Sequence, residues 1–264
     1  MSTMIATFDL STQSQRLALS DPARDARAEP RPWGFWGSLG WGLLAMATAV
    51  FAVVGYTGFW MLTHHLRIPD PSDAAFDIVT GIVASVAPVI VLVIAVKSRQ
   101  YPLRDYFALG SSIPRGQMVL GIVCLIALIV VLEAMEQLLG IDAGSESVAA
   151  TYQAAKLAEM LPMLWLATVI VAPVTEELLF RGFLHRGWAP SWLGVSGTIV
   201  LTAALWAALH QQYNWLGILC IFLMGLIFGW VRQRSGSTTL TIILHSLNNL
   251  FATILVAVQI EWFT

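Results

Sequence analysis

The central stretch of this sequence reads Ala172-Pro173-Val174-Thr175-Glu176-Glu177-Leu178-Leu179-Phe180-Arg181. It places two adjacent carboxylates and a guanidinium inside a segment that is otherwise apolar enough to span a membrane. An ionisable side chain at the centre of a bilayer costs at least about 2.5 kcal/mol, even on the lenient insertion scale. These groups must therefore pair with one another, face a wet cavity or take part in chemistry.

The composition around this stretch is that of an integral membrane protein. The 264-residue chain is 57% hydrophobic and 11% charged, whereas soluble domains carry roughly 25% charged residues. Its apolar runs are continuous and approach or exceed the ~20 residues that cross about 30 Å of hydrocarbon. We therefore predict an all-α, polytopic transmembrane helical bundle of seven spans, with an eighth, re-entrant or broken helix near the C-terminus left open. The predicted spans are 38–62, 76–96, 117–139, 161–183, 193–211, 215–231 and 239–260.

The basic residues indicate how the spans are oriented. They are frequent in the N-terminal tail and in the second, fourth and sixth loops, and sparse in the segments between them. By the positive-inside rule, the N-terminus is cytoplasmic and the C-terminus lies outside. We expect an integral protein of a plasma membrane, the inner membrane if the host is a bacterium.

The first 37 residues are polar, rich in Arg and Asp, and punctuated by proline. They are typical of a disordered cytoplasmic tail, which leaves residues 38–264 as one membrane domain. The net charge of −2 and the lack of a basic cluster give no indication of nucleic-acid binding. Cys124 and Cys220 fall within predicted spans and form neither a disulfide framework nor a metal motif. No cofactor is expected, and the sequence does not indicate an oligomeric state.

Helical spacing separates the roles of the two central carboxylates. Glu177 and Arg181 are four residues apart, so they can pair on one helix face. Glu176 is rotated by about 100° from Glu177 and can face a different environment. Pro173 removes one backbone hydrogen bond and favours a kink that opens space for water beside Glu176.

Two other spans bring polar groups at the same spacing. Trp206 and His210 are four residues apart, as are His245 and Asn249. A neutral histidine and an asparagine amide form a plausible donor pair for a developing oxyanion. Taken singly, His210 can equally be a histidine at the membrane interface. His245 and its neighbouring asparagines can equally form hydrogen bonds that only hold helices together. Straight, upright helices would not place these groups at one depth, so tilt, a kink or different span boundaries are required.

The ordered pattern Glu-Glu-x-x-x-Arg, aromatic-x-x-x-His and His-x-x-x-Asn resembles that of the CAAX protease and bacteriocin-processing enzyme family. Its members are intramembrane glutamic proteases that include the Ras-converting enzyme type. The resemblance covers about residues 160–255 and includes Ala-Pro-x-x-Glu-Glu-x-x-Phe-Arg-Gly around the first motif. One departure is Trp206, where the family usually has phenylalanine.

The resemblance implies hydrolysis of a peptide bond in a membrane-associated or prenylated polypeptide, admitted from the cytoplasmic side or laterally from the bilayer. It implies that Glu176 and His210 activate a water molecule and that His245 and Asn249 stabilise the tetrahedral oxyanion. The paired Glu177 and Arg181 would orient the site.

Three alternatives stay open. A zinc-dependent membrane protease would use Glu176, His210 and His245 as ligands, since three protein ligands plus water is the catalytic zinc pattern. A non-catalytic membrane scaffold or immunity-type protein of the same fold would use the polar cluster only to fix its structure. A proton-coupled transporter would relay protons through the same groups, although no inverted repeat is apparent.

Overall fold

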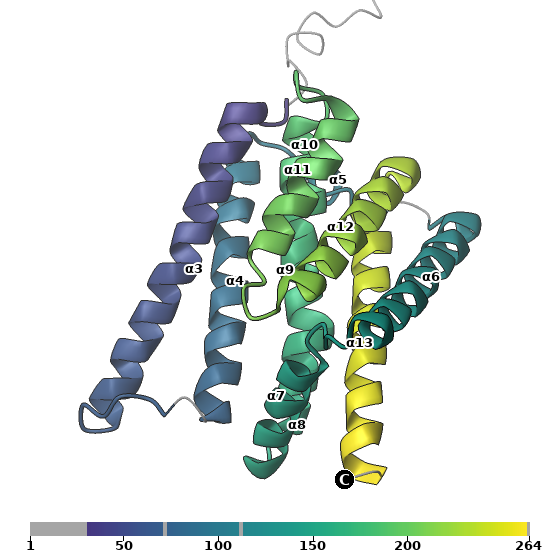
Figure 1. The fold of residues 1–264 in the computed structure, drawn as a ribbon. Coiled ribbons are helices and arrows are strands. Elements are labelled where there is room, and N and C mark those ends of the chain that lie inside the picture. Colours follow the sequence, from purple (N-terminus) through teal and green to yellow (C-terminus); the bar gives the residue numbers. More distant parts are fainter. Residues whose placement is uncertain (1–30, 71–72, 111–112, 263–264) are drawn as a thin grey trace, which may run out of the picture. The chain divides into compact units, whose positions relative to one another are not determined.

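The computed structural model describes residues 31–70, 73–110 and 113–262, and the description below concerns the compact unit that begins at Pro32. All regular structure within these residues is helical (Figure 1). Six helices among them are long and apolar enough to cross a membrane. These are α3 (Phe35–Thr63), α4 (Ala74–Ser98), α6 (Arg115–Leu139), the continuous helix Leu161–Trp188, α12 (Trp215–Ser235) and α13 (Thr238–Trp262). The predicted polytopic helical bundle is confirmed.

The fifth predicted span, residues 193–211, differs from the others. It forms α11 (Gly194–Ala208), an apolar helix of 15 residues. At 1.5 Å per residue α11 is about 22 Å long, which is less than the ~30 Å of a hydrocarbon core. The described residues therefore contain six full-length candidate spans and one shorter helix, and no further long apolar helix near the C-terminus.

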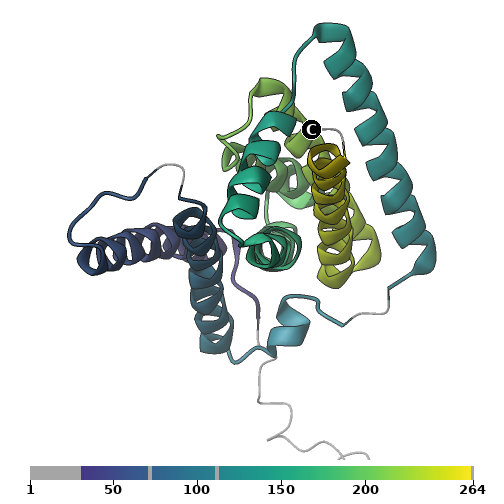
Figure 2. The same ribbon diagram turned by 90° about the horizontal axis from the view of Figure 1, so that it is seen from below.

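The remaining boundaries agree with the predicted ones to within a few residues. Residues 1–30 of the predicted tail lie outside the described residues, and residues 35–37 belong to α3. Two short helices lie between the spans: α5 (Leu103–Tyr106) and α7 (Ser145–Leu157). Seen from below, α3 and α4 form one flank of the unit and α6 forms the other, with α13 and the helix Leu161–Trp188 between them (Figure 2).

The helix Leu161–Trp188 changes its winding on both sides of Pro173. It runs through α8 (Leu161–Trp165), η1 (Leu166–Val171), α9 (Ala172–Glu177), η2 (Leu178–Leu184) and α10 (His185–Trp188), where η1 and η2 are π-helical. Proline has no N–H to donate and its ring crowds the preceding turn of an α-helix. The wider turns accommodate this defect, and such turns occur frequently at functional sites.

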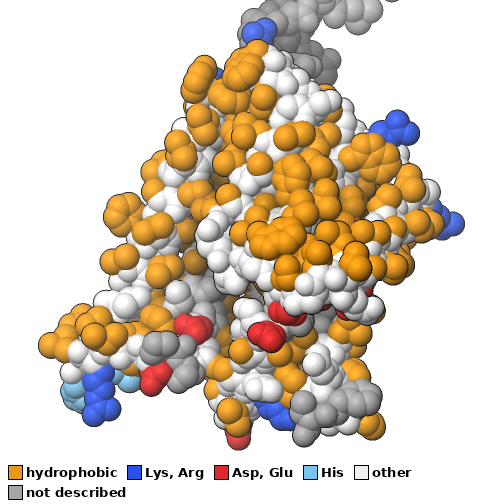
Figure 3. All heavy atoms as spheres, viewed as in Figure 1, with side chains coloured by type: hydrophobic (Ala, Val, Ile, Leu, Met, Phe, Trp, Pro, Cys, Tyr) orange, Lys and Arg blue, Asp and Glu red, His pale blue; other side chains and the backbone are white. Residues whose placement is uncertain are grey.

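Charged side chains divide between the two ends of the unit. We call the end that holds the C-terminus of α4 and the N-terminus of α13 the basic end, and the opposite one the acidic end. The basic end carries Lys97, Arg99, Arg104, Arg115, Arg186, Arg232 and Arg234, with Asp105. The acidic end carries Asp70, Asp73, Asp77, Glu133, Glu136, Asp142, Glu146, Glu159 and Glu261, with Arg67 and Lys156. Figure 3 shows red side chains confined to its lower part, whereas the upper part carries only blue ones.

Hydrogen bonds connect elements at the basic end, and an ion pair connects elements at the acidic end. At the basic end, Thr238 N donates to Ala108 O over 3.1 Å, and Gln117 Nε2 donates to Arg234 O over 3.2 Å. At the acidic end, Lys156 Nζ lies 2.7 Å from Glu261 Oε2 and ties α7 to the end of α13. These contacts bring loops that are far apart in sequence to the same end of the bundle.

Two small residues one helical turn apart, Gly225 and Gly229, pack α12 against α11. A Cβ atom on Gly225 would lie 2.9 Å from Ala203 Cβ, and one on Gly229 would lie 2.9 Å from Ile199 Cγ2. Both distances are too short for ordinary carbon contacts, so the two helices approach closely only because these positions are glycine.

We expect Gly225→Leu to destabilise the folded protein by roughly 1–3 kcal/mol, as overpacking of a tight core does. The measurement is the midpoint of thermal unfolding in detergent. Gly58→Leu on α3 is the matched control, because nothing lies within 4 Å of a Cβ atom at that position. Equal midpoints for the two variants would contradict the close packing of α11 and α12.

Candidate functional site

A cavity of about 420 Å³ lies where η1, α9, α11, α12 and α13 meet. Its wall combines the predicted site residues with small, apolar and amide side chains from the surrounding elements. It is lined by Ala143, Val148, Thr168, Ala172, Glu176, Trp206, His210, Gln212, Tyr213, Gly217, Cys220, Ile221, Met224, His245, Asn248, Asn249, Ala252 and Thr253. Glu176, His210, His245 and Asn249, which come from three separate segments of the sequence, therefore share one cavity, and His210 lies just beyond the end of α11.

The indole of Trp206 connects the carboxylate of Glu176 to both imidazoles. Its Nε1 donates a hydrogen bond to Glu176 Oε2 over 2.6 Å. The centroid of the Trp206 ring system lies 5.4 Å from that of His210 and 5.2 Å from that of His245, both in edge-to-face arrangement. Glu176, His210 and His245 therefore meet around one indole, despite the mismatch in depth that straight, upright helices would give.

Glu177 and Arg181 form a fully buried ion pair beside this cavity. Arg181 Nη1 donates to Glu177 Oε1 over 2.8 Å, and both side chains have no exposed surface. Arg181 Nη2 donates to the carbonyl of Gly225 over 3.2 Å, and the guanidinium carbon lies 4.8 Å from the centroid of the Trp206 ring. The pair predicted from helical spacing therefore links the helix Leu161–Trp188 to α11 and α12.

Hydrogen bonds fix which nitrogen of each imidazole carries a proton. His210 Nδ1 lies 2.9 Å from the carbonyl oxygen of Trp206, and a carbonyl can only accept, so this nitrogen is protonated. His245 Nδ1 lies 3.2 Å from Glu177 Oε1, and the carboxylate fixes its proton by the same argument. In the neutral state each ring thus has an unprotonated Nε2.

The amide of Asn249 is also oriented by a carbonyl. Its Nδ2 donates to Thr168 O over 2.9 Å, and Asn248 Nδ2 donates to Asn249 Oδ1 over 3.3 Å. Because Nδ2 has two hydrogens, one remains available to another acceptor. The amide therefore has a fixed orientation and a spare donor on the cavity wall.

Two residues of the cavity wall cannot be identified as site residues from their spacing in the sequence alone. The four-residue spacing places the Trp206 indole beside His210, but it does not indicate that the ring N–H contacts Glu176. Tyr213, in the connection between α11 and α12, stacks on His210 with ring centroids 6.2 Å apart. Burial raises the pKa of the Tyr213 phenol, and Cys220 and Glu176 add to the effect, so this hydroxyl stays protonated at neutral pH.

The geometry does not favour the alternative in which Glu176, His210 and His245 bind zinc. Among the described residues, no group of three or more His, Cys, Asp or Glu side chains lies close enough together to hold a metal ion. One oxygen of Glu176 accepts the indole hydrogen bond instead. The cavity wall thus carries a carboxylate, two imidazoles and an amide, and the indole of Trp206 lies between the carboxylate and the two imidazoles.

Apolar hollows adjoin this cavity on the side of α6. A groove of about 500 Å³ between α6 and α13 shares Asn248 with the cavity wall. A smaller hollow of about 160 Å³ shares Cys220, Met224, Asn248 and Ala252 with it. The site therefore borders an apolar surface that faces the lipid.

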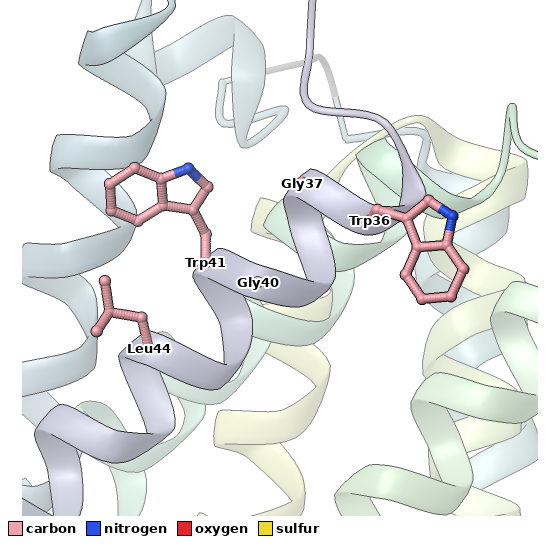
Figure 4. A pocket seen from close by; sticks show the side chains of 5 residues that line it. All are labelled: Trp36, Gly37, Gly40, Trp41 and Leu44. Carbon is pink, nitrogen blue, oxygen red and sulfur yellow. The ribbon is translucent and has the colours of Figure 1, made fainter.

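Another hollow, of about 310 Å³, lies on α3 and is unrelated to this site. Trp36, Gly37, Gly40, Trp41 and Leu44 line it, and the two indoles flank the glycines (Figure 4). None of these side chains is ionisable, so the hollow has no group for acid–base chemistry.

Comparisons with known proteins point to one family. Residues 158–251 match the family described as type II CAAX prenyl endopeptidase, Rce1-like, which confirms the predicted resemblance. An uncharacterized 24.3 kDa protein of Escherichia coli is 41% identical over 86 residues, which cover 30% of this chain and 38% of that protein. The similarity thus spans well under half of that relative. No solved structure matches the chain. The matched region contains all the predicted site residues and Trp206.

We expect Arg181→Ala to be strongly destabilising, because it leaves the carboxylate of Glu177 buried without its partner. Breaking a buried pair in this way costs about 3–5 kcal/mol. The control is Lys156→Ala, which removes the exposed pair with Glu261 and should cost at most about 1 kcal/mol. Thermal unfolding of the two purified variants measures the difference, and comparable losses would refute the structural role of the buried pair.

Proposed function

We propose that this chain, whose residues 158–251 form an Rce1-like domain of the CAAX prenyl endopeptidase family, is an intramembrane endopeptidase. It hydrolyses a peptide bond of a membrane-associated polypeptide with a water molecule activated by Glu176 and His210. The observation that carries the proposal is the grouping of Glu176, His210 and His245 around one indole on the wall of one cavity.

The first step is attack of water on the peptide carbonyl. Glu176 has one oxygen held by the Trp206 indole and the other available to accept a proton from water. His210 has an unprotonated Nε2 in its neutral state and can share this role. As the water oxygen bonds to the carbonyl carbon, the carbonyl π electrons move to oxygen and the water proton passes to the general base.

The second step is breakdown of the tetrahedral intermediate. The oxyanion is stabilised by the spare amide hydrogen of Asn249 and by His245, which donates from Nε2 when both of its ring nitrogens are protonated. The carboxylate of Glu177, 3.2 Å from Nδ1, fixes the orientation of this ring. The oxyanion then re-forms the carbonyl, the C–N bond breaks, and the general base returns its proton to the leaving nitrogen.

The surroundings of the cavity suit a substrate that is anchored in the membrane. The α6–α13 groove is lined almost entirely by apolar side chains and adjoins the cavity at Asn248. A hydrocarbon anchor or a transmembrane segment can approach along this groove without leaving an apolar environment, while the peptide bond enters the polar cavity.

We expect Glu176→Gln to abolish proteolysis while leaving the protein folded, because the amide cannot accept the proton from water. Membranes of cells that contain the wild-type protein or the variant are compared by mass spectrometry of peptide termini. The wild type should produce truncated polypeptide termini that Glu176→Gln lacks. Glu133→Gln is the matched control, because Glu133 is exposed on α6 and does not line the cavity.

The same comparison separates an enzyme from a scaffold. If Glu176→Gln yields the same new termini as the wild type at equal abundance, the general-base role is excluded. A scaffold would also keep its cellular phenotype in Glu176→Ala, His210→Ala and His245→Ala, and would lose it in Gly225→Leu.

We expect Trp206→Phe to reduce the cleavage rate by roughly tenfold or more, with little effect on folding. Phenylalanine keeps most of the aromatic packing but removes the N–H donor to Glu176, and hydrogen bonds to charged groups are worth about 1.5–3 kcal/mol. The rate is measured on a polypeptide identified in the terminus comparison. Trp192→Phe, at an exposed position, is the control, and full activity of Trp206→Phe would show that the hydrogen bond is dispensable.

A further inference from the structure

We propose that the cavity is entered from the acidic end of the bundle, so that the scissile bond of the substrate lies on the extracytoplasmic side of the membrane. This inference takes its chemistry from the proposed function and adds the side of access. It differs from the expectation, drawn from the family resemblance, that substrates arrive from the cytoplasmic side.

The half of the bundle toward the basic end is closed. Every residue from Glu177 to His185 is buried, whereas most positions from Leu161 to Glu176 are at least partly accessible. On α13 the buried positions are dense from Thr238 to His245 and become sparse beyond it. The change from a closed to an open interior therefore occurs at the site itself.

Specific contacts seal this closed half. Tyr106 and Phe183 stack with ring centroids 5.5 Å apart, and both are fully buried. Arg232 Nε donates to the carbonyl of Arg181 over 3.0 Å, and Trp188 Nε1 donates to the carbonyl of Phe35 over 3.2 Å. A peptide or a chain of water molecules arriving from the basic end would have to break these contacts.

The half toward the acidic end offers a passage instead, lined by both polar and apolar side chains. A second cavity of about 160 Å³ shares Val148, Thr168, Gln212, Tyr213 and Thr253 with the wall of the main one. Its outer part is lined by residues of α7, including the exposed Ser147 and Thr151. Hydroxyl and amide groups thus connect the main cavity to the surface of α7.

The position of this passage identifies the end to which it leads. The segment between α6 and α7 contributes Ala143 to the cavity wall, and Ala143 N donates to Glu136 Oε1 over 2.9 Å. Asn214 Nδ2 donates to the carbonyl of Asp142. The mouth of the cavity is thus built from residues that neighbour the carboxylates of the acidic end.

The distribution of charge assigns this end to a side of the membrane. Lysine and arginine in short loops stay on the cytoplasmic side, and acidic residues contribute little to orientation. The basic end, defined above by its seven lysine and arginine side chains from Lys97 to Arg234, is then cytoplasmic and the acidic end extracytoplasmic. The substrate class that fits is a membrane-anchored polypeptide whose cleavage site has already crossed the bilayer.

Thiol labelling measures the side of access without depending on catalysis. In a protein with Cys124→Ala and Cys220→Ala, Thr168→Cys reports on the wall shared by the two cavities, and Arg234→Cys reports on the basic end. A membrane-impermeant maleimide is added to spheroplasts, where it meets the extracytoplasmic face, and to inverted vesicles, where it meets the cytoplasmic face.

We expect Thr168→Cys to react at least tenfold faster in spheroplasts than in inverted vesicles, and Arg234→Cys to show the opposite preference. Ser147→Cys, at an exposed position of the passage, repeats the measurement if the Thr168 variant folds poorly. Faster labelling of either passage position in inverted vesicles would overturn the proposal. The proposal would also be overturned if Thr168→Cys stayed unlabelled from both sides of the membrane while Ser147→Cys reacted. The labelling does not depend on cleavage. A failure of the proposed proteolysis, which the comparison of peptide termini detects, is therefore distinguished from a wrong side of access.

Discussion

The buried pair of Glu177 and Arg181 is the interaction on which the arrangement of the other elements depends. Burying two charges is costly, and further hydrogen bonds offset part of that cost, although Glu177 Oε2 and Arg181 Nε have no hydrogen-bond partner among the described residues. Arg181 reaches the carbonyl of Gly225 on α12, and Glu177 meets the imidazole of His245 on α13. A single pair on one helix thereby fixes the positions of two others.

The pair also determines what its neighbour can do. Glu177 points into the closed interior, whereas Glu176, about 100° further round the helix, reaches the cavity wall. The first carboxylate stays ionised beside a cation, and the second retains an oxygen that faces open space. Adjacent residues of the same type thus acquire a structural and a proposed catalytic role because the helix turns between them.

The sequence predicted the elements and the pairing better than it predicted the contacts inside the cavity. The membrane spans follow from hydropathy, and the Glu177–Arg181 pair follows from the four-residue spacing of the two side chains. Both are local properties of the sequence. The hydrogen bond from Trp206 to Glu176 joins residues 30 positions apart and depends on the length and tilt of α11, which hydropathy does not encode. The π turns lie on both sides of Pro173, where the sequence predicted only a kink, because proline indicates a defect in the helix without indicating how the backbone accommodates it.

The shortness of α11 has a consequence for the path of a polar peptide to the site. At about 22 Å the helix ends before the far side of a hydrocarbon layer of ~30 Å, and the connection from Leu209 to Asn214 follows it at that depth. Irregular backbone inside a bilayer is tolerated only where protein or a water-filled cavity surrounds it. The connection meets this condition because Gln212 and Tyr213 line the cavity that also holds Glu176, so a polar peptide has a shorter apolar distance to cross before it reaches that carboxylate.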